Sequence, residues 1–359
     1  MYTLKFTKNI CALLCFLAIG FNVQAQEHKW EKLATEPYPG KQDDITFVDE
    51  NTGWYINGYG KIYHTEDAGK TWEKQLEQKG SFFRTIAFVD KNTGFAGTVG
   101  TDYFPNVTDT IPLYGTKDGG KTWTPVAYKG PYVKGLCAID VVKEQYINHG
   151  KIDYKTHLFA VGRVGSPANI MISHDAGETW ESRSMNEDCK MLFDIKMLNK
   201  NVGFACAATS EDITTSNALI LKTIDGGKTW KKVYQSSRPY ETTWKASFPT
   251  DKVGYVTIQS YNPDPTVVQQ RIAKTVDGGE TWEEINLVED NRGREFGIGF
   301  IDENHGFVGT VNSGYETNDG GKTWTAIDLG MACNKIKIYK NDQGEIYGYA
   351  IGVNVFKYN

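Results

Sequence analysis

The sequence has few of the residues on which metal and redox chemistry depend. It carries six cysteines and six histidines in 359 residues, and beyond the first 25 residues neither type falls into the close pairs typical of metal sites. No glycine-rich phosphate loop, dinucleotide fingerprint or Ser-His-Asp order is visible. The sequence therefore does not support a metalloenzyme, a nucleotide-dependent enzyme or an oxidoreductase. We expect the protein to bind no metal and no cofactor.

Basic charge and long apolar runs are also scarce. The formal net charge of −5 becomes −7 when Lys5 and Lys8 leave with a leader, which argues against nucleic-acid binding. The apolar run at 10–21 lies between these lysines and the small-residue end Val23-Gln24-Ala25. This order is typical of a secretory signal, and the run is too short to span a bilayer. We therefore predict a signal peptide at 1–25, export to the periplasm or the extracellular space, and no membrane-spanning segment.

Four cysteines remain after the leader, and their wide separation in sequence shows no metal-like spacing. They are Cys137, Cys189, Cys206 and Cys333. An exported protein could pair them, so disulfide formation stays open. We expect them chiefly as small apolar core residues.

What the chain has in quantity is one repeated phrase, Thr/Ser-x-Asp-x-Gly-x-Thr-Trp, which we call the Asp phrase. Its six copies run from Asp67 to Trp72, Asp118 to Trp123, Asp175 to Trp180, Asp225 to Trp230, Asp277 to Trp282 and Asp319 to Trp324. Successive copies are 42 to 57 residues apart, a period that fits the four short strands of a propeller blade. We expect a structural role, in which the carboxylate accepts hydrogen bonds at a tight turn, the glycine is left-handed and the tryptophan packs between hairpins.

A hairpin phrase precedes each Asp phrase and sets the number of blades. Clear copies start at Phe47, Phe88, Met197, Phe248 and Phe300. Degenerate copies start near Cys137, with a longer turn through Tyr146 and His157, and near Ile336. Seven hairpins predict an all-β, seven-bladed propeller in one domain, 26–359. The last blade lacks a fourth strand, and the segment around Trp30 resembles one, so we predict that it closes the ring. We expect a monomer.

Together the two phrases resemble the Asp-box, or BNR, repeat of sialidases, sortilin ectodomains, some xyloglucan-cleaving enzymes and photosystem II stability/assembly factors. The pairing of F-V-D-x-N-x-G-[WF] with T-x-D-G-G-K-T-W is most similar to the last family, and it covers nearly the whole mature chain. The resemblance implies a seven-bladed propeller that binds an assembly intermediate without catalysis.

Variable loops gather at one end of the predicted blades, which is typical of a binding surface on a rigid scaffold. We predict that this end binds a protein or a carbohydrate through a charged funnel with an aromatic edge. The predicted partner-binding residues are Asp44, Arg84, Tyr103, Lys134, Arg163, Arg238, Tyr240, Trp244, Lys245, Tyr261, Arg294 and Glu295. Six of them, Asp44, Arg84, Lys134, Lys245, Arg294 and Glu295, stand where the inner strands begin, next to the central channel.

The alternative is a glycan-active hydrolase, either sialidase-like or of another type. Two of the carboxylates Asp44, Asp212 and Glu295 would act as general acid and base if they faced each other across the channel. The Arg-Ile-Pro strand that a sialidase needs is absent. A xyloglucan-cleaving enzyme would need two propellers, and this chain has length for one. A non-catalytic binding protein is therefore the favoured interpretation.

Overall fold

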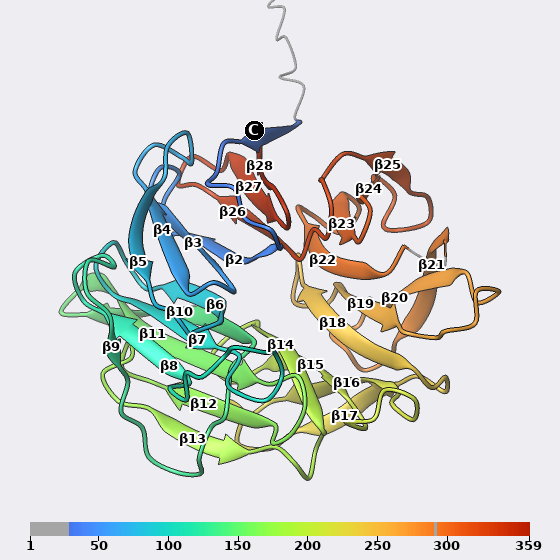
Figure 1. Cartoon of the computed structure of the whole chain (residues 1–359), viewed down its shortest axis with the longest axis horizontal. Helices are drawn as coiled ribbons and strands as arrows, with labels where there is room; N and C mark the ends of the chain where they lie inside the picture. Colours follow the sequence, from blue (N-terminus) through green and yellow to red (C-terminus); the bar gives the residue numbers. More distant parts are fainter. Residues whose placement is uncertain (1–28, 291–292) are drawn as a thin grey trace, which may run out of the picture.

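Seven four-stranded antiparallel sheets stand around a central axis in the computed structural model, which describes residues 29–290 and 293–359 (Figure 1). The predicted all-β, seven-bladed propeller is confirmed. The predicted signal peptide and the start of the domain at residue 26 lie outside the described residues. Among the described residues, no helix is long and apolar enough to cross a membrane.

Each blade runs outward from its inner strand. Blade 1 contains β2 (Gln42–Phe47), β3 (Gly53–Asn57), β4 (Lys61–Thr65) and β5 (Glu73–Glu77), and blade 2 contains β6 (Phe83–Phe88), β7 (Gly94–Thr98), β8 (Leu113–Thr116) and β9 (Thr124–Pro125). Blade 3 contains β10 (Ala138–Asn148), β11 (Lys151–Gly162), β12 (Asn169–Ser173) and β13 (Glu181–Ser184), and blade 4 contains β14 (Met191–Met197), β15 (Gly203–Ala208), β16 (Ala218–Thr223) and β17 (Lys231–Gln235). Blade 5 contains β18 (Glu241–Ser247), β19 (Gly254–Ser260), β20 (Gln269–Thr275) and β21 (Glu283–Glu289), and blade 6 contains β22 (Glu295–Phe300), β23 (Gly306–Thr310), β24 (Gly314–Thr317) and β25 (Thr325–Ile327). Blade 7 contains β26 (Lys335–Lys340), β27 (Ile346–Ile351), β28 (Val355–Tyr358) and, as its outer strand, β1 (Trp30–Leu33).

The first strand of the chain closes the ring, as the sequence predicts. Strand β1 pairs antiparallel with β28, from Trp30↔Tyr358 to Leu33↔Val355. The Trp30 ring lies 5.2 Å from both the Phe307 ring of blade 6 and the Tyr358 ring. Closure therefore combines a strand ladder with aromatic packing, and it covers the edge that β28 would otherwise expose.

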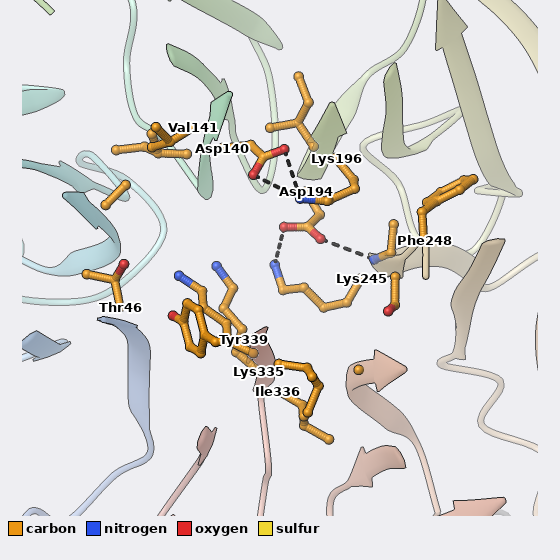
Figure 2. A pocket seen from close by; sticks show the side chains of 18 of the residues that line it. Thr46, Asp140, Val141, Asp194, Lys196, Lys245, Phe248, Lys335, Ile336 and Tyr339 are labelled. Atoms are coloured by element: carbon orange, nitrogen blue, oxygen red, sulfur yellow. Dashed lines mark hydrogen bonds and ion pairs between the residues drawn. The ribbon is translucent and has the colours of Figure 1, made fainter. Parts of the chain in front are cut away.

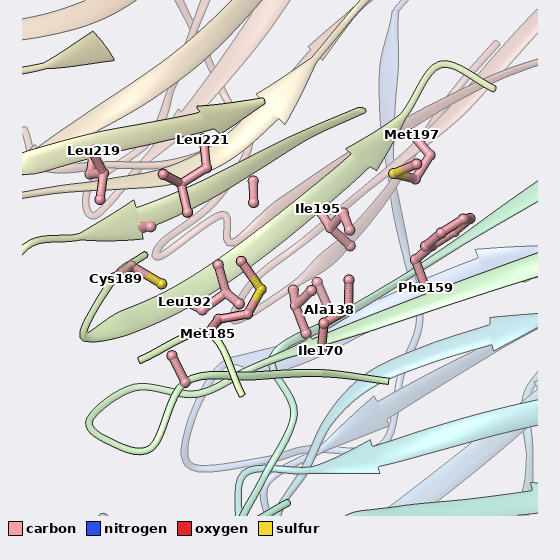
Figure 3. Packing of buried hydrophobic residues seen from close by; sticks show 14 residues of the cluster. Ala138, Phe159, Ile170, Met185, Cys189, Leu192, Ile195, Met197, Leu219 and Leu221 are labelled. Carbon is pink, nitrogen blue, oxygen red and sulfur yellow. The ribbon is translucent and has the colours of Figure 1, made fainter. Parts of the chain in front are cut away.

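Apolar side chains fill the spaces between neighbouring blades. Figure 3 shows one such layer, in which Phe159 and Ile170 of blade 3 meet Leu192 and Leu221 of blade 4. Flat strand faces allow this packing because alternate residues point to opposite neighbours. The four cysteines that follow the predicted leader are free and buried among such residues, which agrees with their expected core role.

In each Asp phrase, hydrogen bonds between the Asp and the Thr four residues later hold the turn between the third and fourth strands. In blade 1, Asp67 Oδ1 accepts the Thr71 N–H at 2.9 Å, and its Oδ2 accepts the Thr71 hydroxyl at 2.7 Å. These bonds lower the pKa of Asp67 to about 2. Because the folded pKa lies below the unfolded value, the stabilisation is present above pH ~4 and is lost as the pH falls towards 2.

Two residues after each Asp have a left-handed backbone, not one as the phrase alone suggests. Gly69 follows Ala68, with φ of +86° and +62°. Alanine also stands at this first position in blade 3, as Ala176 with φ +58°. Five of the six phrase tryptophans pack edge-on against strand aromatics, as Trp72 does on Tyr55 with 4.6 Å between ring centroids. The predicted turn and packing roles are thus visible in the contacts.

Replacing Asp225 with alanine is expected to lower the free energy of unfolding by about 1–2 kcal/mol without changing partner binding. The carboxylate accepts bonds from the Thr229 N–H at 2.9 Å and the Thr229 hydroxyl at 2.6 Å. Urea unfolding followed by tryptophan fluorescence measures the effect. The exposed Asp251, whose side chain has no hydrogen bond or ion pair with the described residues, is the matched control. Lost binding with unchanged stability in the Asp225→Ala variant would contradict the structural role.

Blade 3 departs from the expected hairpin. The residues predicted as a longer turn, from Tyr146 towards His157, continue the two strands instead, and the pairing runs to Asn148↔Lys151. The chain reverses in a two-residue turn, His149 and Gly150, with φ of +49° and +77°. Such a turn matches the natural strand twist and so extends a hairpin without disturbing it.

Candidate functional site

The antiparallel order of each blade separates two faces of the disc. The loop from second to third strand and the connection to the next blade lie at one end, which we call the long-loop face. The inner hairpins and the Asp phrases lie at the other end, the Asp-phrase face. On the long-loop face the longest connection runs from 99 to 112, between β7 and β8. Variable length is therefore concentrated where the sequence predicts a binding surface.

Guanidinium and aromatic groups meet on the long-loop face where the inner strands begin. The Arg84 Cζ lies 5.4 Å from the Trp244 ring centroid, and the Arg294 Cζ lies 4.6 Å from that of Tyr261. Burial raises the pKa of Tyr103, and three arginines close to its hydroxyl oppose that rise. We call this group the mouth cluster: Arg84, Tyr103, Arg163, Trp244, Tyr261 and Arg294.

Two of the three arginines in the mouth cluster are held by the scaffold. Arg84 is 7% exposed and forms an ion pair with Asp43, which also binds Lys41 at 2.6 Å. Burial, and then the charge of Arg84, lower the pKa of Lys41 to about 8. Arg163 is buried and donates to two backbone carbonyls 2.8 and 3.0 Å away. Arg294 is half-buried and makes the ring contact with Tyr261, so it is the arginine best placed to meet a partner.

Four of the predicted partner-binding residues lie outside the mouth cluster and make other contacts. Lys134 pairs with a carboxylate of the long β7–β8 loop. Lys245 turns into the channel and binds a buried carboxylate at 3.3 Å. Arg238 binds two glutamates, at 2.6 and 3.0 Å, within blade 5. Tyr240 contributes its carbonyl, which accepts the Tyr261 N–H at 2.8 Å. The predicted funnel is therefore smaller than expected.

The three candidate catalytic carboxylates do not form a pair. Asp44 and Glu295, which the sequence places next to the central channel as a candidate acid and base, are both 0% exposed. Asp44 is bound by lysines of blade 7. Asp212 lies on the exposed loop between β15 and β16, where it accepts the Thr214 N–H at 2.9 Å. No two of these acids therefore face a common substrate position.

Glu295 is a buried acid, and neither of its carboxylate oxygens has a hydrogen-bond partner among residues 29–290 and 293–359. Burial raises its pKa well above the ordinary value. Since the folded protein favours the protonated form, the free energy of unfolding falls as the pH rises above about 4.5 towards the folded pKa. At neutral pH the buried Glu295 therefore lowers the free energy of unfolding.

Replacing Glu295 with glutamine is therefore expected to raise the stability at pH 8 by about 1–3 kcal/mol and to change it little at pH 4. Thermal unfolding at both pH values measures the difference. Glu289→Gln, at an exposed position at the end of β21, is the matched control. An equal gain at the two pH values would contradict the titration argument.

The central channel holds a cavity of 620 Å³ lined by all seven inner strands. Its walls carry five lysines: Lys143, Lys196, Lys245, Lys335 and Lys337. Figure 2 shows two of them directed at acids on the inner strand of the neighbouring blade, Lys245 at Asp194 and Lys196 at Asp140. Four of the five lysines are thus paired with carboxylates, and the channel wall is an internal network of ion pairs.

Comparison with known proteins finds relatives over part of the chain, although no family model matches it. The protein is 29% identical over 195 residues to the Photosystem II assembly lipoprotein Ycf48 of Picosynechococcus sp., which covers 46% of this chain and 56% of that protein. The protein of the same name from Prochlorococcus marinus is 46% identical over 55 residues, or 15% of this chain and 16% of that one. The chain thus spans about half the length of the first relative and less of the second.

Solved structures of proteins named YCF48 are similar in fold to almost the whole of this chain. YCF48 bound to D1 peptide has a TM-score of 0.63 and 16% identity, with 94% of this chain and 96% of that chain covered. The resemblance to the photosystem II assembly factors is confirmed. YCF48 from Cyanidioschyzon merolae gives a TM-score of 0.62 at 16% identity over 92% and 98% of the two chains. An ancestral GH74 enzyme also reaches 0.62, at 13% identity over 88% of this chain and 44% of the enzyme. At these identities each likeness to a solved structure establishes the fold alone.

An aromatic groove next to the mouth cluster was not predicted. Phe82 stacks on Phe104 with 4.4 Å between ring centroids, and Tyr38 meets Tyr59 edge-on at 4.8 Å. These rings line a cavity of 400 Å³. Only Phe104 lies in a conspicuously long loop, whereas Tyr59 sits in the short turn between β3 and β4. The aromatic Phe82, at the end of the connection between blades 1 and 2, is the signal that could have revealed the groove.

Proposed function

We propose that this protein is an exported, non-catalytic propeller that binds another protein through its long-loop face, in the manner of an assembly or stability factor. Under this proposal, residues 1–25 form a cleaved signal peptide, and residues 26–359 form one monomeric domain built on Asp-box turns. The convergence of arginine and aromatic side chains in the mouth cluster carries the proposal. Arginine, tyrosine and tryptophan dominate the energetically important positions of protein interfaces.

The chemistry of the mouth cluster favours a protein segment with carboxylate and apolar side chains. Arg294 offers a guanidinium already placed on the Tyr261 ring, so it loses little side-chain entropy when it binds a carboxylate. The adjacent groove around Phe82 and Phe104 offers space for an apolar side chain. A solved YCF48 held a D1 peptide, which supports a protein partner.

A glycan partner remains the alternative ligand on the same face, because aromatic rings also stack on sugars. The hydrolase alternative is weaker. Its candidate acids Asp44 and Glu295 are fully buried, and Asp212 stands apart on an outer loop. A general acid and base must both reach the scissile bond.

Site-directed photo-crosslinking in the native cell envelope tests the proposal. A benzophenone side chain replaces Tyr103 on the long-loop face or Lys252 on the Asp-phrase face of the mature, full-length protein. We expect one discrete protein adduct from position 103 and none from position 252. Arg294→Glu is expected to reduce the adduct about tenfold, with a smaller effect at high salt. Arg84 is not reversed, because it is buried on Asp43.

The outcomes separate the alternatives. An adduct that persists in the Arg294→Glu variant would move the binding site away from the mouth cluster. Equal adducts from both faces would contradict a long-loop interface. Capture of no protein, together with protection of Tyr103 from chemical modification by a purified envelope glycan, would favour a carbohydrate ligand on this face.

A further inference from the structure

The long hairpin of blade 3 is unlike the inner hairpins of the other six blades, which close within five or six residues. Leu158 pairs with Ser173, the first residue of its Asp phrase, as Gly53 pairs with Thr65 in blade 1. Beyond Leu158 the ladder continues from Val142↔His157 to Asn148↔Lys151. At about 3.4 Å per pair, it extends about 24 Å past the point where the ladder of an ordinary inner hairpin ends. We call residues 142–157 the ribbon, and it lies on the Asp-phrase face.

The tip of the ribbon carries an unusual concentration of exposed apolar side chains. Ile147 is 78% exposed and Ile152 is 62% exposed, and the two face each other across the ladder. Tyr154 is 56% exposed and Tyr146 is 43% exposed. Four of the eleven large exposed hydrophobic residues in the described chain thus fall within 146–154. Such clustering marks an interaction site, whereas single exposed apolar residues need no explanation.

The apolar side chains occupy both sides of the ribbon. Strand alternation and the observed register place Ile147, Ile152 and Tyr154 on one side and Tyr146 on the other. A flat protein surface would cover only one side. A medium that surrounds the tip would cover both, and tyrosine is enriched at the boundary between lipid and water.

Three lysines lie along the ribbon: Lys155 stands behind the apolar tip, Lys143 lies further back at the channel wall, and Lys151 lies beside the turn, beyond the Ile147↔Ile152 pair. Lys143, Lys151 and Lys155 make no ion pair with any residue in the described part of the chain. Of the two ribbon acids, Glu144 pairs with Lys200 outside the ribbon at 2.6 Å, whereas Asp153 accepts the Tyr146 hydroxyl within it at 2.9 Å, so three lysines outnumber two acids in residues 142–157. The ribbon is therefore locally basic in a chain with a formal net charge of −5. Its charge complements an anionic surface.

We propose that the tip of the ribbon binds an anionic lipid bilayer and inserts Ile147, Ile152 and the flanking tyrosines to interfacial depth. Insertion is shallow because β12 pairs with β11 only from Leu158 to Gly162, and unpaired strand edges cannot enter hydrocarbon. The Lys155 ammonium group contacts lipid phosphate from behind the tip, and Lys151, beside the turn, extends its flexible side chain back to the phosphate level. A reach of about 24 Å exceeds two screening lengths at physiological salt, so the acidic body is held clear of like-charged headgroups.

Vesicle co-sedimentation of the mature, full-length protein tests this inference. The vesicles contain phosphatidylethanolamine with about one third phosphatidylglycerol, and neutral phosphatidylcholine vesicles are the second arm. We expect binding to the anionic vesicles and at least tenfold weaker binding to the neutral ones. The double variant Ile147→Ser, Ile152→Ser is expected to lose at least tenfold in affinity for the anionic vesicles.

A matched control uses apolar residues on the same face but outside the ribbon. Ile224 is 70% exposed and Val276 is 59% exposed, and both stand beside Asp phrases. The Ile224→Ser, Val276→Ser variant is expected to bind vesicles as the wild type does. In a Tyr146→Trp variant, vesicles should shift the tryptophan emission to shorter wavelength at the ribbon.

Several results would overturn the proposal. It fails if the wild type does not bind anionic vesicles or if the Ile147→Ser, Ile152→Ser variant binds them unchanged. Concentration-dependent self-association that is abolished by this double variant, without vesicle binding, would assign the ribbon to a second copy of the chain. Because the ribbon lies on the face opposite the mouth cluster, these outcomes do not depend on the proposed protein partner.

Discussion

Replacing Asp44 with alanine is expected to lower the free energy of unfolding by about 3–5 kcal/mol. Its Oδ2 accepts the Ile86 N–H of blade 2 at 3.0 Å and lies 2.9 Å from the Lys335 Nζ of blade 7. Its Oδ1 lies 3.1 Å from the Lys337 Nζ. One carboxylate thus joins three blades, and its loss leaves two lysines with little access to water and no counter-charge.

The same variant is expected to flatten the acid limb of the stability curve. Burial alone would raise the pKa of Asp44, but Lys335 and Lys337 hold it below its usual range. Because the folded pKa is depressed, the stabilisation is full above pH ~4 and decreases as the pH falls further. Urea unfolding at pH 7 and at pH 3 measures both effects. Equal losses at the two pH values would contradict the ionic origin.

A combined substitution separates charge from packing at this position. Adding Lys335→Met to Asp44→Ala removes one of the stranded ammonium groups, so part of the lost stability should return. Asp43, one residue away, belongs to the separate Arg84 pair and stays unchanged in this experiment. If the double variant is less stable than Asp44→Ala alone, Lys335 stabilises the fold by contacts other than this ion pair.

The second large effect is expected at the ring closure, where Trp30→Ala should cost about 2–3 kcal/mol. This figure is below the ~3–5 kcal/mol of a fully buried tryptophan because Trp30 is only half-buried. The substitution removes both ring contacts, to Phe307 and to Tyr358. Since the ladder from Trp30 to Leu33 is short, we expect faster amide exchange throughout β28.

Glu31→Ala is the control for the closure experiment, because Glu31 occupies the same strand with an exposed side chain. Its effect should stay within about 0.5 kcal/mol. Hydrogen exchange and urea unfolding measure both variants. The role of Trp30 would be refuted if β28 kept its protection in Trp30→Ala, or if both variants lost stability equally.

The repeated phrases made the scaffold predictable because each acts through local chemistry. Asp67 and Thr71 lie four residues apart and bind each other directly, so their spacing is sufficient to identify the turn. The fourth strand of blade 7 was also predictable, because the segment at Trp30 resembles those that follow the Asp phrases. The ribbon was missed because Gly150 alone is a weak turn signal, and the alternation of Tyr146, Ile147 and their neighbours was interpreted as an irregular loop.

Burial at the mouth could not be predicted from a single strand. Asp44 and Arg84 both stand near the start of an inner strand, where solvent access depends on the neighbouring blades. The lysines that bind Asp44 come from β26, 291 residues further along the chain for Lys335. The same limit applies to Glu295, which lies in a space closed by other strands. Long-range packing therefore decided which predicted charges became binding groups and which became internal ones.

The pairing of β1 with β28 also sets how the ring responds to mechanical force. Trp30 lies opposite Tyr358, and Leu33 lies opposite Val355, so the two extremities of the ladder are neighbours. A pull applied between residues 30 and 358 breaks the hydrogen bonds one after another, starting at Trp30, and does not load them together in shear. The β1–β28 ladder, which seals the propeller in solution, therefore opens one residue pair at a time under this tension.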